Sequence, residues 1–179
     1  MTNIQAMLAL SSKYDWAVGM GWYPSARLQC EQLAEQHGAE VKRVVWAVAA
    51  LSPQLKWERN VAAAKAVLQG ETRYPGVYPA NVEKSHHIVY APDDWERWLS
   101  GLKVTSFALN MWGDTETVTV DTWAWRIWAG VDLWHKPPSL DRLYERIADD
   151  YAGRFTLAKV NTDEEQRKVM ERLRNLGYL

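Results

Sequence analysis

This sequence has very little cysteine and almost no net charge. Cys30 is the single cysteine among 179 residues. One cysteine excludes an internal disulfide, a zinc site built on several cysteines and a four-cysteine iron–sulfur cluster, and it fits a reducing, cytosolic setting. The 21 Lys+Arg and 22 Asp+Glu residues give a formal net charge of −1. Near-neutrality argues against a broad electrostatic surface for nucleic acid, although it allows a local basic patch.

Long apolar runs and common catalytic motifs are also missing. No run reaches 18 apolar residues, so we expect no membrane-spanning helix. The N-terminus, "MTNIQAMLALSSKYDW", lacks the basic and apolar regions of a signal peptide. There is no GxxxxGK[ST] phosphate loop, no GxGxxG after a strand, no HExxH and no GxSxG. The adjacent His86 and His87 fall on different helix faces and are poor joint ligands, so we expect no metal site and no bound cofactor.

Tryptophan, in contrast, is abundant, and helix start and stop signals recur along the chain. Most of the 11 tryptophans are expected in the core, and some are candidates for stacking on bases. Serine starts, glycine stops and amphipathic spacing predict an all-α protein. The expected helices cover residues 25–38, 39–52 (central and buried), 57–70, 81–91, 92–101, 103–114, 121–130, 139–153 and 161–179, with a loop at 71–81 and an extended stretch at 115–120.

The stretch from Gly101 to Trp128, "GLKVTSFALNMWGDTETVTVDTWAWRIW", contains a lysine and an aspartate of chemical interest. Lys103 follows a tight turn that feeds a helix, where free backbone N–H groups could hold a phosphate. Asp121 is a natural N-cap for the next helix. A lysine amine is also a usable nucleophile, and a carboxylate stabilises positive charge developing on a sugar. A working pair and a purely structural cap are both open on this pattern.

Two separated motifs resemble the helix-hairpin-helix DNA glycosylase superfamily, in particular its endonuclease III-like branch. That branch carries a hairpin ending in G-x-K, a helix containing "LN", and "VDT" before a helix with an arginine. The counterparts here are "GLK" at 101–103, Leu109–Asn110, "VDT" at 120–122 and Arg126. "VVWAVAALSPQLKWERNVAAAKAVL" is similar to the early helix pair around "LLSAQ". The hairpin "LSGLK" is two residues shorter than the usual L-P-G-V-G-x-K, and Trp123 replaces the histidine of VDTH.

The resemblance implies a single domain over residues 1–179 with two helical lobes, a cleft between them and a hairpin-like motif at 99–128. It implies a DNA glycosylase that binds duplex DNA, flips a base and acts at its glycosidic bond, for repair or modification. Lys103 and Asp121 would be catalytic. The residues implied to contact DNA are Ser52, Gln54, Gly101, Leu102 and Arg126, and the candidates for the base pocket are Trp57, Trp112 and Trp123.

Two further functions stay open at this point. One is a bacteriophage type of thymine hypermodification, in which an amine or amino acid is joined to an activated base on the same fold. The other is a non-catalytic helical module that binds DNA or a protein. DNA is the expected partner in the enzyme readings, no membrane is involved, and the expected location is the cytoplasm of a bacterium or of a phage-infected host.

Overall fold

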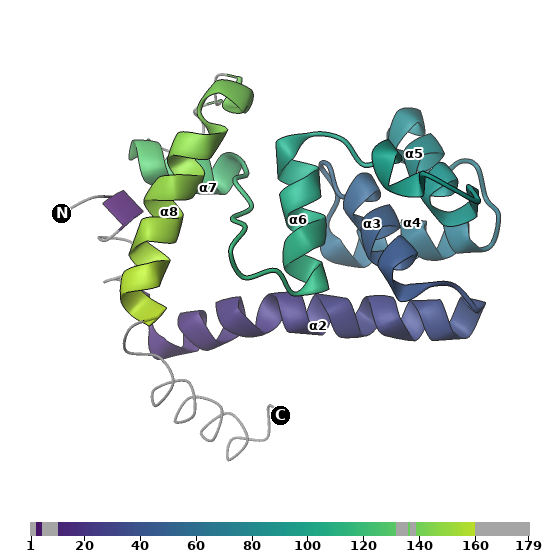
Figure 1. Cartoon of the computed structure of the whole chain (residues 1–179), viewed down its shortest axis with the longest axis horizontal. Helices are drawn as coiled ribbons and strands as arrows, with labels where there is room; N and C mark the ends of the chain where they lie inside the picture. Colours follow the sequence, from purple (N-terminus) through teal and green to yellow (C-terminus); the bar gives the residue numbers. More distant parts are fainter. Residues whose placement is uncertain (1–2, 5–10, 132–135, 137–138, 160–179) are drawn as a thin grey trace, which may run out of the picture. The chain divides into compact units, whose positions relative to one another are not determined.

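The structure is a computed structural model that describes residues 3–4, 11–131, 136 and 139–159. Within these ranges the regular elements are all helical, so the all-α prediction is confirmed (Figure 1). They are α2 (Lys13–His37), α3 (Val41–Leu51), α4 (Trp57–Leu68), α5 (Pro79–Tyr90), η1 (Trp95–Trp98), α6 (Leu102–Trp112), α7 (Thr122–Ala129), η2 (Leu140–Arg142) and α8 (Tyr144–Lys159). The expected helix at 161–179 lies outside the described residues.

The chain divides into two compact units, one of residues 23–115 and one of residues 1–22 and 116–179. In the first unit α3 is the central helix, as predicted, and every residue from Val44 to Leu51 is buried. Small and branched apolar side chains from α2, α4, α5 and α6 pack around it. Full burial of one Val or Leu side chain contributes roughly 1.5–3 kcal/mol, so the apolar composition of α3 explains its central place.

Three segments differ from the prediction: the start of α2, the segment 92–101, and the helix expected at 139–153, which is the 3-10 turn η2 followed by α8 from Tyr144 to Lys159. Helix α2 begins at Lys13, well before the expected start at Ser25. The reason is a capping box: the Asp15 amide donates to Ser12 Oγ (3.2 Å), and the Ser12 amide donates to Asp15 Oδ2 (2.8 Å). The hydrogen bonds from Ser12 also lower the pKa of Asp15. Pro24 and Ser25 lie inside this helix rather than at its start.

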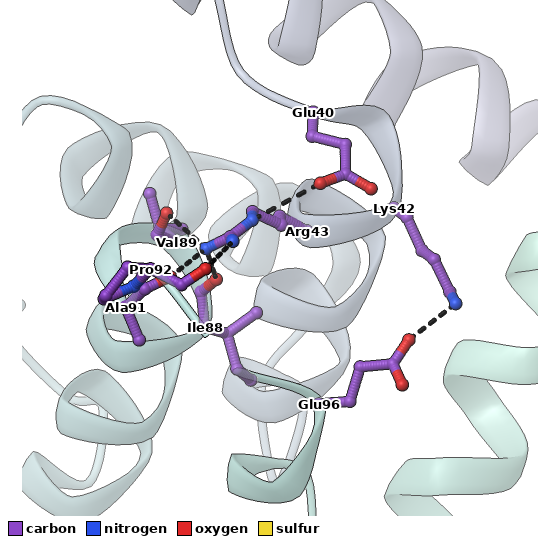
Figure 2. A network of polar contacts seen from close by, with 8 residues as sticks. All are labelled: Glu40, Lys42, Arg43, Ile88, Val89, Ala91, Pro92 and Glu96. Carbon is purple, nitrogen blue, oxygen red and sulfur yellow. Dashed lines mark hydrogen bonds and ion pairs between the residues drawn. The ribbon is translucent and has the colours of Figure 1, made fainter. Parts of the chain in front are cut away.

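The second difference is the segment 92–101, which forms only the 3-10 turn η1 instead of a helix. The guanidinium of Arg43 in α3 binds the backbone that precedes η1 (Figure 2). Arg43 Nη1 donates to the carbonyl oxygens of Ile88 (3.1 Å), Val89 (3.2 Å) and Ala91 (2.6 Å). A positive charge at the carboxyl end of α5 satisfies carbonyls that have no partner within the helix. Arg43 therefore satisfies carbonyls at the end of α5 and holds the chain that leaves it.

The second unit has its own small core. Val120, Trp125, Ile147 and two tyrosines of α8 are its buried members, together with Ile4. The stretch 115–120 is non-helical, as predicted. In the part of the chain that the structure describes, no helix is long and apolar enough to cross a membrane.

Candidate functional site

Gln54 lies in a strained turn between α3 and α4. The Leu55 amide donates to the Ser52 carbonyl (3.1 Å), which closes a four-residue turn with Pro53 at its second position. Gln54 has a φ of +63°. Because proline fixes a negative φ at the second position, this is the type II turn, whose third position normally holds glycine. The Gln54 side chain is exposed, and Tyr78 donates its hydroxyl to Gln54 Oε1 (3.0 Å).

Ser52, which opens this turn, and Trp57, the first residue of α4, are less exposed than Gln54. Ser52 is half-buried, and its hydroxyl oxygen is buried with no hydrogen-bond partner among the described residues. Trp57 packs against the core of the unit and donates its indole N–H to Gln29 Oε1 (3.1 Å). This is the usual environment of a structural tryptophan. The role of Trp57 in a base pocket stays a prediction.

Lys103 lies in the first turn of α6, where the sequence places it. Gly101 precedes the helix with φ +98° and ψ 130°, a conformation that a residue with a Cβ rarely adopts. Lys84 of α5 donates to Ser100 Oγ (2.9 Å) and so holds the residue before this glycine. No side chain caps the first amides of α6. Leu102 is 44% exposed and Lys103 is half-buried.

Trp112, at the other end of α6, is a packed side chain. Its ring lies edge-on to Trp46, with 6.2 Å between centroids, and the Arg27 guanidinium lies 4.5 Å from the ring centroid. Arg27 also donates to the Trp112 carbonyl and pairs with Glu31 (2.8 Å). These contacts hold Trp112 against the core of the unit. Its contact with a flipped base stays a prediction.

Asp121 is the N-cap of α7, as predicted. Its Oδ1 accepts hydrogen bonds from the amides of Trp123 and Ala124, both at 2.9 Å. The second oxygen, Oδ2, accepts no hydrogen bond from any residue that the structure describes. The carboxylate is half-buried. Oδ1 therefore has a structural function, as the cap of the first turn of α7.

Trp123 and Arg126 follow directly on α7. Trp123 is 56% exposed, which is unusual for the largest apolar side chain. The Arg126 guanidinium lies 5.2 Å from its ring centroid, within the range of a cation–π contact. An exposed indole beside a guanidinium suits stacking against a flat, electron-rich ligand.

The predicted site residues are distributed over both units. Ser52, Gln54, Trp57, Gly101, Leu102, Lys103 and Trp112 belong to the unit of residues 23–115, and Asp121, Trp123 and Arg126 belong to the other. Lys103 and Asp121 each lie at the start of a helix, and Gln54 lies in the turn between α3 and α4. No group of three or more His, Cys, Asp or Glu side chains that could hold a metal ion occurs within the described ranges.

Sequence reasoning missed four side chains that make long-range hydrogen bonds, one of them to the side chain of Gln54 and two to the backbone beside Asp121. They are Arg43, Tyr78, Tyr144 and Tyr151. Only the two tyrosines of α8 could have been found from the sequence, because they are seven residues apart and share a helix face with the buried Ile147. Arg43 and Tyr78 act on segments far away in the sequence, so no local pattern points to their partners.

Comparison with protein families gives a match over residues 1–164 to a family of unknown function, DUF7178. The chain belongs to this family. No curated protein and no solved structure matches the chain.

Proposed function

We propose that this protein is a DNA-binding enzyme of the DNA glycosylase type, which flips a base and acts at its glycosidic bond with Lys103 and Asp121. The observation that carries the proposal is Gln54, an exposed polar side chain held on strained left-handed backbone by Pro53. Such strain costs about 1–3 kcal/mol and is concentrated at functional sites. The resemblance to the glycosylases assigns this same residue to the space that a flipped base vacates.

The chemistry assigned to Lys103 is nucleophilic. Its Nζ lone pair forms a bond to C1′ of the sugar while the glycosidic C–N bond breaks, and the base leaves with that electron pair and gains a proton. Opening of the sugar ring then gives a protonated Schiff base. Loss of a C2′ proton from this species expels the 3′ phosphate with its bonding electrons and cuts the strand.

The chemistry assigned to Asp121 is electrostatic. The sugar carries positive charge in the transition state, and we assign its stabilisation to Asp121 Oδ2, which accepts no hydrogen bond from the described residues. The other oxygen stays on the amides of α7 and keeps the carboxylate from rotating. Trp123 and Arg126 of the same helix supply a surface on which a base could stack.

Borohydride trapping on a duplex with one abasic site tests the proposal directly. The parent protein is expected to give a covalent DNA adduct, and Lys103→Ala is expected to give none. Lys65→Ala is the matched control, because Lys65 is an exposed lysine in the last turn of α4 in the same unit. Adduct formation by Lys103→Ala, or its loss in Lys65→Ala, would overturn the assignment of the nucleophile.

The near-neutral charge of the chain favours a second candidate, a non-catalytic module that binds DNA or a protein. Retained DNA binding without any adduct or base release would support it. A base-modifying transferase is the remaining alternative. Mass analysis of nucleosides, after incubation of the protein with an amine and a duplex carrying an activated base, would identify that reaction.

A further inference from the structure

We propose that Tyr144 and Tyr151 of α8 are positioning residues that hold the carboxylate of Asp121 in place. This inference rests on the function proposed for Asp121. Both tyrosines are 6% exposed, and both direct their hydroxyls at the backbone on either side of this residue. Both hydroxyls are engaged with backbone groups next to Asp121, so their effect would reach the reaction through Asp121.

The contact before Asp121 is made by Tyr144. Its hydroxyl accepts a hydrogen bond from the Val120 amide (3.0 Å) and donates one to the Val118 carbonyl (3.0 Å). The stretch that contains these groups is not helical, and no strand pairs with it among the described residues. Val120 is fully buried, so its amide needs a partner within the protein. The Tyr144 hydroxyl therefore supplies hydrogen bonds that a neighbouring strand would otherwise provide.

The contact after Asp121 is made by Tyr151. Its hydroxyl donates to the Ala124 carbonyl (2.9 Å). Ala124 is also the residue whose amide donates to Asp121 Oδ1. Burial, and to a smaller extent the negative charge of Asp121, raises the pKa of Tyr151 to about 12, so this hydroxyl keeps its proton at neutral pH.

The two contacts bracket Asp121 within a few residues on each side. Ile147, which is fully buried on the same face of α8, fixes the helix that carries them. A carboxylate that acts on a transition state must be held within about 0.5 Å of its productive position by supporting contacts. The tyrosine hydroxyls satisfy this requirement, whereas the cap bonds of Asp121 alone would leave the preceding chain free to move.

The experiment compares Tyr144→Phe, Tyr151→Phe and Asp121→Asn with the parent in borohydride trapping on the abasic-site duplex. Phenylalanine keeps the ring and removes only the hydroxyl. We expect Tyr144→Phe to lower the maximal trapping rate at least tenfold and to leave the half-saturating DNA concentration within twofold. In the Asp121→Asn background the same change should add less than a twofold loss. Tyr90→Phe is the matched control, because the Tyr90 hydroxyl bonds to the Val67 and Leu68 carbonyls of the other unit.

A second readout separates this inference from the proposed function. NMR amide exchange should be at least tenfold faster at Trp123 and Ala124 in Tyr144→Phe than in the parent, with the amides of α3 unchanged. If the parent traps no DNA, the proposed function fails, and unchanged exchange at these two amides would also refute the positioning inference. If the parent traps DNA and Tyr144→Phe traps it at the parental maximal rate, the positioning inference alone is wrong.

Discussion

Replacement of Asp121 by asparagine separates the structural use of this residue from its chemical use. Asparagine retains a side-chain oxygen that can accept from the amides of Trp123 and Ala124, the two bonds that Asp121 Oδ1 makes at 2.9 Å. Asparagine and aspartate are about equally good N-caps. What asparagine lacks is the charge, whose interaction with the amino end of α7 contributes about 0.3–1 kcal/mol. We therefore expect a small loss of stability.

Alanine at the same position supplies the comparison. It removes the acceptor, leaves both amides of the short helix α7 without the cap, and is expected to cost about 0.5–2 kcal/mol. For a chain of this size about 1 kcal/mol shifts Tm by about 2–4 °C. The expected order of Tm is thus parent, then Asp121→Asn close below it, then Asp121→Ala.

Activity should follow a different order. Loss of one electrostatic partner of a transition state slows an enzyme by about a hundred- to a thousandfold. Asp121→Asn and Asp121→Ala should therefore be similarly slow in base release and in strand cutting, despite their different Tm values. The assay is single-turnover kinetics on duplex DNA, with the rate expressed per folded molecule. If Asp121→Asn melted well below the parent and reacted at the parental rate, Asp121 would be a structural cap and the reasoning would be refuted.

Three further predictions concern the surrounding fold. Arg43→Met should lower the free energy of unfolding by about 2 kcal/mol in urea titrations, because the carbonyls that Arg43 binds lose a charged donor. The control Arg97→Met, at an exposed arginine, should change the free energy of unfolding little. Gln54→Gly should raise Tm by relieving about 1 kcal/mol of left-handed strain, whereas Gln54→Ala should not; equal Tm values would show that the turn is unstrained. The raised pKa of Tyr151 means that the folded state favours the neutral phenol, so stability present below pH 10.0 is lost as pH rises to about 12. The variant Tyr151→Phe should not lose this part of its stability as the pH rises. A curve of stability against pH identical to that of the parent would contradict the prediction.

Local sequence signals predicted most of the helices correctly. Gly113 and Gly130 adopt left-handed conformations directly after α6 and α7, and Asp121 caps α7, because these features depend only on nearby backbone. The buried place of α3 followed from its apolar composition. The start of α2 was also encoded locally, in the Ser12–Asp15 capping box, but the later Ser25 was a misleading start signal.

The function-related residues were predictable only as positions along the chain. The sequence placed Lys103 at the start of a helix and Asp121 at a cap, and the structure confirms both places. It gave no sign that Gln54 has a positive φ, because glycine, the usual marker of that conformation, is absent from the turn. The packing of Trp112 against Trp46 and Arg27 was equally hidden, since tryptophans of the core and of a binding surface look alike in a sequence.

The sequence by itself determined the all-α class, the helix ends marked by glycine and the chemical character of the candidate residues, since each depends on groups a few positions apart. The tertiary structure decided which backbone groups those residues meet. Arg43 reaches carbonyls more than forty residues away, and Tyr144 reaches the chain more than twenty residues before it. Such partners are selected by the packing of whole helices, in which many weak contacts act together, and no short stretch of sequence contains that information.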